Sequence, residues 1–511
     1  MESVSPAAAR PRPWAALVTF LIIQAVLACW WAAFYPGLFS RDSVLYLSHT
    51  IVGPWVSDHS VAYDALLWLS FTRTGDLGAV TFAQTTAMAG ALTYLARSLG
   101  ALGAPRWATT LVAVLAPLTP TVGAFTVTLW KDVPFTICAI MIAGVCARMA
   151  ARRRVSLAGL GVLMTLLGLF RANGFLVVGI AVVVLLVVVA TRRVRLALVG
   201  TVAAAVPLLL TNLLFPRFGI TPPSSTYVYH TAFADVAVAF RERPELFTER
   251  DKALMASVAP LSRWWEGGTC ATVNLLIWRR DFSWPAADAH AGELLGLWER
   301  LLADDPGMIV GTRLCRGAIA WSPVQDPYVV GGMTYRFSRR PTADTYVGPG
   351  KVPDFAGRGV FSLRPLSAEL NQVAEPWLTG ALLPQWDWVL WRGASWAYLS
   401  YAAVALGALA LRNRYVVGVA AVVAGQQLAV LANISAQDFR YMAAPIFVGL
   451  LLVPLLLASA GRLLLAAARS ARRALRRPAP PAAGTKPAAE TGPDDQAERP
   501  GQATGTDDQA D

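Results

Sequence analysis

Long apolar runs dominate this chain of 511 residues. Several of them reach the roughly 20 apolar residues that an α-helix needs to cross about 30 Å of hydrocarbon. Hydrophobic residues make up 55% of the chain and charged residues only 15%, a balance that a soluble protein of this length does not show. The sequence therefore predicts an all-α polytopic membrane protein and argues against a large soluble protein with buried helices.

Hydropathy predicts about ten transmembrane helices. The first run is too long for a signal-peptide core and no small-residue cleavage site follows it, so we expect it to remain as an anchor. The shorter segment 61–71 is expected to be an interfacial or re-entrant helix. The expected spans are residues 14–34, 77–95, 107–129, 134–147, 157–170, 175–190, 196–215, 388–411, 416–431 and 441–465.

Arginine clusters mark alternate connections between these spans. They are Arg10 and Arg12, Arg97 and Arg106, Arg148 with Arg152 to Arg154, Arg192, Arg193 and Arg195, Arg412 and Arg414, and Arg462 through Arg477. Positive charge is retained on the cytoplasmic side of a membrane, so one orientation of ten spans places every cluster and both termini in the cytoplasm of a bacterial cell. The formal charge of +12 is then a topology signal, and we expect no nucleic-acid partner.

Composition divides the chain into five parts. Residues 1–13 are a cytoplasmic tail, and residues 14–215 are a transmembrane core with a first outer loop at 35–76. Residues 216–385 lack a membrane-length apolar run, which predicts a mixed, partly helical extracytoplasmic domain between the seventh and eighth spans. Residues 386–469 add the last transmembrane helices, and residues 470–511 have too little apolar content to fold, so we expect a disordered cytoplasmic tail.

Two of the five cysteines, Cys270 and Cys315, fall in the predicted outer domain. An extracytoplasmic compartment permits a disulfide between them, although spacing alone does not show that they approach each other. Both the paired and the unpaired state stay open at this point.

Charged residues gather at four of the connections predicted to face outward, where positive charge is normally depleted. They are Asp42, Asp58 and His59 in the first loop, Lys131 and Asp132 in the second, Arg171 beside Asn173 in the third, and Asp438 and Arg440 in the last. A structural alternative exists for single residues: Asp132 can cap a helix, Asp438 can pair with Arg440, and cations can reach toward lipid headgroups. Three cations at one depth, however, make a natural seat for a lipid-linked phosphate or diphosphate.

The chain resembles the GT-C superfamily of integral-membrane glycosyltransferases, which use polyprenyl-phosphate sugars on the outer face of the membrane. The resemblance covers mainly residues 14–215 and is carried by the acid of the first outer loop and the amphipathic segment after it. More narrowly, the chain is similar to bacterial GT-C-like proteins in Tyr35, Pro36, Gly37, Asp42 and Ser43, in Asp58 and His59, in Trp130, Lys131 and Asp132, and in Arg171, Asn173 and Gly174.

The resemblance implies transfer of a sugar from a polyprenyl-phosphate donor to an acceptor hydroxyl, with inversion at the anomeric carbon. Asp42 would be the base that takes the acceptor proton, and Lys131, Arg171 and Arg440 would bind the donor phosphate. Asp58, His59, Asp132 and Asn173 would orient the acceptor or support these groups. Ser43 stands where the family often has Glu, and Ser60 follows His59 where relatives often have Pro, so a divalent cation is left open and the substrate unassigned.

Two other functions remain open from the sequence. A secondary transporter or lipid flippase also has many spans and intramembrane charge, but transporters place ionisable residues near the bilayer midplane on broken helices. A noncatalytic cell-envelope assembly factor would use the outer domain to bind a partner, and its outer-loop charges would point apart. The acceptor of a transferase can be a glycan, a glycolipid or a protein.

Overall fold

Helices build the whole of the described chain. The computed structural model describes residues 13–152, 156–189, 191–324 and 363–475, within which three isolated β-bridges occur and no strand is formed. Residues through Leu463 form one unit, and residues from Leu464 onward form a second. The prediction of an all-α membrane protein is confirmed. The two predicted tails lie almost entirely outside the described residues.

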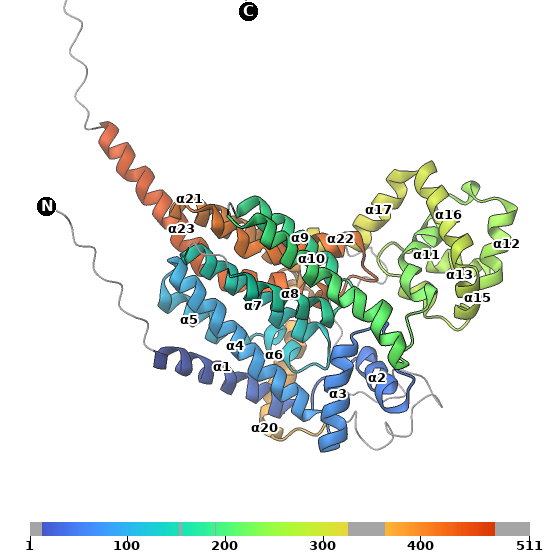
Figure 1. Cartoon of the computed structure of the whole chain (residues 1–511), viewed down its shortest axis with the longest axis horizontal. Coiled ribbons are helices and arrows are strands. Elements are labelled where there is room, and N and C mark those ends of the chain that lie inside the picture. Colours follow the sequence, from blue (N-terminus) through green and yellow to red (C-terminus); the bar gives the residue numbers. More distant parts are fainter. Residues whose placement is uncertain (1–12, 153–155, 190, 325–362, 476–511) are drawn as a thin grey trace, which may run out of the picture. The chain divides into compact units, whose positions relative to one another are not determined.

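The membrane-type helices match the expected apolar runs (Figure 1). They are α1 (Pro13–Ala33), α4 (Gly78–Leu102), α5 (Arg106–Leu115), α6 (Pro120–Thr126), α7 (Asp132–Arg152), α8 (Leu157–Phe170), α9 (Gly174–Val188), α10 (Arg193–Leu209), α21 (Gly393–Leu411), α22 (Ala421–Ala432) and α23 (Ala443–Leu475). Short 3₁₀ and π segments extend three of them: η3 (Leu210–Leu214) and η4 (Phe215–Phe218) follow α10, η9 (Arg414–Ala420) precedes α22, and η10 (Phe439–Met442) precedes α23.

Six helical segments of the described chain are long and apolar enough to cross a membrane. A seventh candidate is the pair Arg106–Leu118 and Pro120–Thr126, which bends by 65° where Pro120 begins the second helix. The helices α8 and α9 have only 14 and 15 residues, which is short of a full crossing. The helix α4 has 25 residues but carries buried polar side chains such as Gln84 and Thr85, so it is less apolar than the six.

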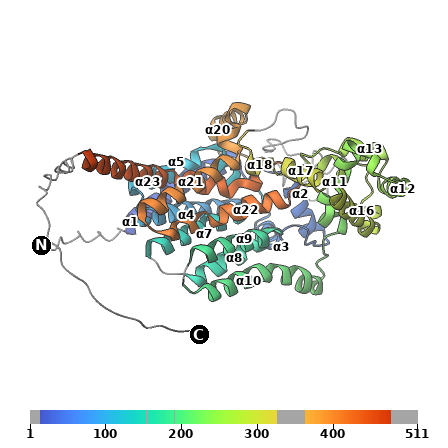
Figure 2. The same ribbon diagram turned by 90° about the horizontal axis from the view of Figure 1, so that it is seen from above.

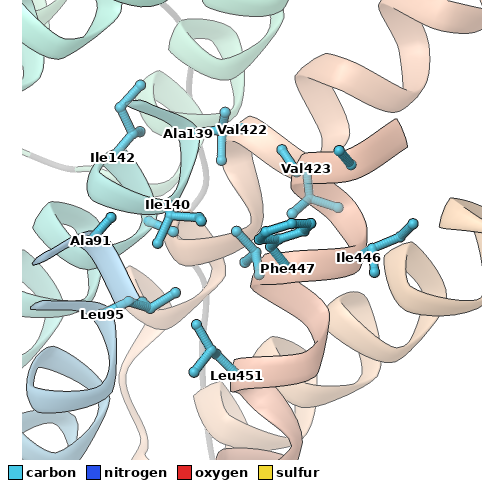
Figure 3. Close-up of a cluster of buried hydrophobic side chains, with 14 of the residues drawn as sticks. Ala91, Leu95, Ala139, Ile140, Ile142, Val422, Val423, Ile446, Phe447 and Leu451 are labelled. Carbon is cyan, nitrogen blue, oxygen red and sulfur yellow. The ribbon is translucent and has the colours of Figure 1, made fainter. Parts of the chain in front are cut away.

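The helix α7 lies at the centre of the bundle, between α4 on one side and α22 and α23 on the other (Figure 3). The labelled side chains there are Ala91, Leu95, Ala139, Ile140, Ile142, Val422, Val423, Ile446, Phe447 and Leu451, each at most 2% exposed. The helices α8, α9 and α10 pack on one another beside α7 and α22 (Figure 2). This packing fixes the direction of α7, whose first residue, Asp132, belongs to the predicted site.

The two ends of α7 meet different connections. At its C-terminal end, Arg148 Nε donates to Ser98 Oγ of α4 at 3.1 Å, and the Asn413 amide donates to the carbonyl of Ala150 at 2.9 Å. Its N-terminal end carries the acidic Asp132. A helix of 21 residues is about 32 Å long, so these groups lie a membrane thickness apart.

Short helices make up the region between α10 and α21; those of residues 225–316 are grouped together in Figure 1, whereas the helix of residues 368–381 packs against α1. They are α11 (Ser225–Glu242), η5 (Pro244–Leu246), α12 (Glu249–Val258), α13 (Leu261–Gly267), α14 (Asn274–Ile277), α15 (Trp284–Ala289), α16 (Ala291–Asp304), α17 (Pro306–Arg316), α18 (Ala318–Trp321), α20 (Ala368–Ala381), η7 (Pro384–Trp386) and η8 (Asp387–Trp391). A mixed domain was expected, but the described part of this region is helical. Residues 325–362 of the predicted domain lie outside the described residues.

The helices α11 to α17, named the outer helices after their predicted location, have their own apolar core, in which Phe233 and Trp264 are fully buried. Within this group, Asp235 of α11 forms ion pairs with Arg313 at 2.6 Å and with Arg316 at 2.8 Å, and both arginines belong to α17. The structure also joins Cys270 and Cys315 in a disulfide bond, with Cα atoms 5.7 Å apart. The sequence left that pairing open.

Candidate functional site

The loop after α1, predicted to be the first outer loop, positions Asp42 through a short helix, α2 (Arg41–Leu47). Ser43 Oγ accepts from the backbone N–H of Ser40 at 3.0 Å, which caps the start of this helix, and donates to the Leu129 carbonyl at 2.8 Å. Ser40 also accepts a hydrogen bond from the Trp130 indole at 2.6 Å. Ser43 therefore ties the Asp42 helix to the segment that carries Lys131.

The backbone before α2 lies close against the same segment. Leu38 exchanges backbone hydrogen bonds with Val127 and Leu129 at 3.0 and 2.9 Å. At Gly37, where φ is +155°, a Cβ would lie 2.8 Å from a Thr81 methyl carbon and 2.9 Å from the Val127 carbonyl oxygen. A side chain at this position would push the two segments apart. This glycine accordingly sets the distance between the Asp42 loop and the Lys131 turn.

Arg440 is the centre of the charged cluster. Its Nη1 lies 2.5 Å from Asp42 Oδ2 and 4.0 Å from Asp132 Oδ2, and its Nε lies 3.0 Å from Asp438 Oδ2. Its remaining nitrogen, Nη2, donates to the Tyr441 hydroxyl at 3.3 Å. Carboxylates from three separate connections thus meet at one guanidinium that is 12% exposed.

Asp132 joins Arg440 to a second cation. Its Oδ1 lies 3.0 Å from Arg171 Nη1, and the Asp132 side chain is 1% exposed. The Arg171 guanidinium also lies 4.6 Å from the centre of the Tyr441 ring, and that of Arg440 lies 5.0 Å from the same ring. The connection that carries Arg171 and the one that carries Arg440 are therefore held together by ion pairs through Asp132 and by a shared aromatic ring.

Lys131 connects this cluster to a neighbouring group of histidines. Lys131 Nζ donates to the Tyr46 hydroxyl at 3.2 Å. The Tyr46 ring makes an edge contact with the His59 ring, with 5.1 Å between the ring centroids. His59 Nδ1 lies 2.8 Å from Asp58 Oδ1, and His49 Nδ1 lies 3.7 Å from the same oxygen. Asp58 thus orients the His59 imidazole, whereas His49 lies nearby with its Nδ1 lacking a hydrogen-bond partner among the described residues.

The outer helices contribute to the site directly. The Tyr227 hydroxyl of α11 lies 3.5 Å from His59 Nε2, and Thr221 N donates to the Trp55 carbonyl at 2.8 Å. The first outer loop is therefore covered by the start of the outer region. No pattern in the sequence pointed to Tyr227.

The outer helices also hold the loop that carries Asp438 and Arg440. Val273 N donates to the Ser435 carbonyl at 2.9 Å, and the Gln437 amide donates to the Cys315 carbonyl at 2.8 Å. His230 Nε2 lies 2.7 Å from Ser435 Oγ. Two of these contacts involve the two ends of the stretch closed by the disulfide, residues 270–273 and residue 315. The outer region therefore fixes the position of Arg440.

The charges of the cluster alter the acidity of its members. Burial opposes ionisation of Asp42, but the neighbouring Arg440, Lys131 and His59 hold the pKa of its carboxyl below the ordinary value. Burial raises the pKa of Asp438 to about 6 against the opposing effect of Arg440. Burial also lowers the pKa of Lys131, because a buried ammonium loses its hydration.

A further acid, Asp64 of α3 (Val61–Thr74), lies in the same loop and is 1% exposed. Burial raises its pKa to about 8, and the charge of Asp58 adds to the effect. Its Oδ1 has no hydrogen-bond partner among the described residues. Asp64 is therefore held mainly as the neutral acid at neutral pH. The segment around it was expected to be helical, as α3 is.

Most of the predicted site residues come together. Ion pairs link Asp42, Asp132, Arg171 and Arg440, whereas Lys131 reaches Asp58 and His59 through Tyr46. The exception is Asn173, which precedes α9: its buried amide oxygen lacks a hydrogen-bond partner among the described residues.

Four site residues were missed by the sequence analysis: His49, Tyr46, Tyr227 and Tyr441. A signal existed for two of them. Tyr46 follows Asp42 by four residues, one turn of a helix, and Tyr441 is adjacent to Arg440.

Metal binding is not supported by a ligand set in the described part of the chain. No three His, Cys, Asp or Glu side chains are grouped there so as to hold a metal ion. The three carboxylates nearest one another face Arg440 instead. Comparisons of the chain with protein-family models, with curated proteins and with solved structures found no match.

Proposed function

We propose that this protein is a membrane glycosyltransferase that moves a sugar from a polyprenyl-phosphate donor to an acceptor hydroxyl. The observation that carries the proposal is the convergence of Arg440, Arg171 and Asp42 from three connections far apart in the sequence, linked through Asp132. A guanidinium group can bind two oxygens of one phosphate through two parallel N–H···O hydrogen bonds. A carboxylate beside it can accept a proton. The GT-C resemblance supports the same assignment.

The reaction needs one base and neutralisation of a leaving group. The acceptor oxygen forms a bond to the anomeric carbon, while the bond from that carbon to the phosphate oxygen breaks and its electron pair stays on the phosphate. The acceptor proton passes to Asp42. Arg440, Arg171 and Lys131 stabilise the charge on the departing phosphate. Attack opposite the leaving group inverts the anomeric carbon.

The proposed topology has ten spans, with both termini in the cytoplasm and the site at the outer surface of a bacterial plasma membrane. The seven span candidates, the shorter helices α8 and α9, and α4 together supply ten helices. The arginine-rich end of α7 supports this orientation, because Arg148 and Arg152 lie about a membrane thickness from Asp132. In that orientation α11 to α17 are extracytoplasmic.

The charge arrangement disfavours the two rival functions. An assembly factor whose outer charges served separate partners would not need ion pairs among four connections. A transporter or flippase would be expected to hold its ionisable groups near the midplane, whereas Asp132 begins α7 and Asp42 belongs to a loop helix. The amino acids that support catalysis are therefore also those that argue against transport.

A transfer assay tests the proposal. The purified full chain is reconstituted in liposomes with radiolabelled polyprenyl-phosphate mannose or arabinose and a lipid extract as acceptor, and released polyprenyl phosphate is measured. The wild type should cleave one of these donors, and Asp42→Asn should lower turnover by about 100-fold or more, the usual range for loss of a general base. Asp76→Asn, which removes an acid paired with Arg364 outside the cluster, is the matched control. Full turnover by Asp42→Asn, or passage of intact donor across the membrane without cleavage, would reject the proposal.

A further inference from the structure

Each of the three guanidinium nitrogens of Arg440 already lies against an oxygen of the described chain. Its Nε faces Asp438, its Nη1 faces Asp42 and Asp132, and its Nη2 faces the Tyr441 hydroxyl. A phosphate binds arginine through two adjacent N–H groups, as a carboxylate does. A phosphate that binds two adjacent nitrogens of Arg440 in this way therefore competes with a partner that is already present.

Asp42 is the partner best able to leave. Asp438 also accepts from the backbone N–H of Arg440 at 3.2 Å, so it is held by its own turn. Asp132 is 1% exposed and is paired with Arg171 as well. Asp42 is 24% exposed, the most of the three, and its side chain makes no other hydrogen bond or ion pair among the described residues.

We propose that Asp42 occupies the phosphate position on Arg440 when no donor is bound, so that the donor phosphate and the Asp42 carboxylate compete for one guanidinium. This inference rests on the proposed function and adds an order of events to it. The donor phosphate takes Arg440 and releases Asp42, which then faces the acceptor hydroxyl without its cation. The ion pair thus keeps the base inactive until the donor is in place.

The balance of charge in the cluster supports such an exchange. Three carboxylates, Asp42, Asp132 and Asp438, are matched by three cations, Lys131, Arg171 and Arg440, so an entering phosphate adds an uncompensated negative charge if every contact is kept. Exchange of one carboxylate avoids crowding a fourth anion around Arg440. Once separated from the guanidinium, Asp42 is a better base, because partial burial favours the protonated form of a carboxyl group.

Binding of farnesyl phosphate to the purified full chain in detergent tests the competition. Loss of the competing carboxylate in Asp42→Asn should tighten binding about tenfold, which corresponds to about 1.4 kcal/mol. Asp76→Asn changes the net charge equally and should leave the affinity within about twofold. The gain from Asp42→Asn should vanish in an Arg440→Gln background, because the contested guanidinium is gone. Farnesol, which lacks the phosphate, is the ligand control.

The possible outcomes separate this inference from the function on which it rests. One outcome is that farnesyl phosphate binds the wild type better than farnesol does and that Arg440→Gln weakens its binding, but that Asp42→Asn binds it no more tightly. The competition is then wrong, whereas the proposed phosphate-binding site at Arg440 is retained. If farnesyl phosphate and farnesol bind with the same affinity to every variant, both the proposed phosphate-binding site and the competition are wrong. Equal gains in Asp42→Asn and Asp76→Asn would reduce the effect to net charge and overturn the competition.

A second variant and a measurement on the wild type protect the test against misfolding. Asp42→Ser also removes the carboxylate and should give the same gain. In wild-type protein, farnesyl phosphate should slow amide exchange in residues 437–441 and speed it in residues 40–47, since α2 loses its ion pair. Slower exchange in both segments would contradict the competition, because Asp42 would then have stayed in place.

Discussion

Opening the Cys270–Cys315 disulfide should loosen the loop that carries Arg440, although neither cysteine contacts the arginine. The structural reason is that Gln437 donates to the Cys315 carbonyl, and Val273, three residues after Cys270, donates to the Ser435 carbonyl. Both hydrogen bonds depend on segments that the disulfide holds together. The perturbation is the double variant Cys270→Ser with Cys315→Ser.

The size of the effect follows from the length of chain that the disulfide closes. The cysteines are 45 residues apart, and a loop of that length corresponds to about 4 kcal/mol of lost chain entropy in the open state. Each 1.4 kcal/mol changes an equilibrium about tenfold, so opening of this region becomes up to roughly a thousandfold more frequent. Amide exchange reports that frequency when closing is faster than exchange.

Hydrogen exchange with mass spectrometry on the full chain in detergent measures the change. Exchange should rise in peptides from residues 226–240 of α11 and from residues 433–441, and it should stay constant in α7. Cys29→Ser, which removes an unpaired thiol, is the matched control. Faster exchange in α11 with no change in residues 433–441 would refute the reasoning, because the outer region would then not hold the Arg440 loop.

Three further predictions concern single side chains. Asp64 binds a proton in the folded state up to about pH 8 but releases it near its ordinary pKa of 3.8 when unfolded, so its contribution to stability falls as the pH rises between these values. Asp64→Asn should therefore raise the apparent melting temperature more at pH 8.5 than at pH 5, and an equal shift at both would contradict the assignment. Ser43→Ala removes a helix cap and should cost about 1 kcal/mol of local stability, seen as faster exchange in residues 41–47; unchanged exchange would show that the cap is unimportant. Arg171→Gln leaves the buried Asp132 with a distant partner and should cost about 3 kcal/mol, whereas adding Asp132→Asn should restore much of the loss of thermal stability; no recovery would argue against the ion pair.

The sequence was sufficient to predict which connections carry the charged residues that meet in one cluster, because the predicted topology places alternate loops on one side of the membrane. It was not sufficient to predict the pairing within the site. That Arg440 contacts Asp42, 398 residues away, depends on how α7 and α23 pack in the bundle. The disulfide stayed undecided for the same reason, since spacing does not determine approach.

The outer region was the part of the fold that the sequence predicted least well. Its helices are short and its sequence is rich in Trp, Pro and Gly, which do not separate helices from loops, so a mixed domain was expected. Tyr227 reaches His59 only because α11 follows directly after the segment that binds the first outer loop. Asn173, in contrast, stood next to Arg171 in the sequence but is not joined to the cluster by a side-chain hydrogen bond in the described chain.

The central proposal is that four connections, all predicted to face outward, form one binding site for a lipid-linked phosphate. An electron cryo-microscopy structure of the full chain in nanodiscs with farnesyl phosphate tests it most directly. The account predicts density for the phosphate within hydrogen-bond distance of Arg440 and of Arg171 or Lys131, with the Asp42 carboxylate no longer on Arg440. Phosphate density at the arginine-rich end of α7, near Arg148, or at the lipid-facing surface with the Asp42–Arg440 pair intact would contradict it.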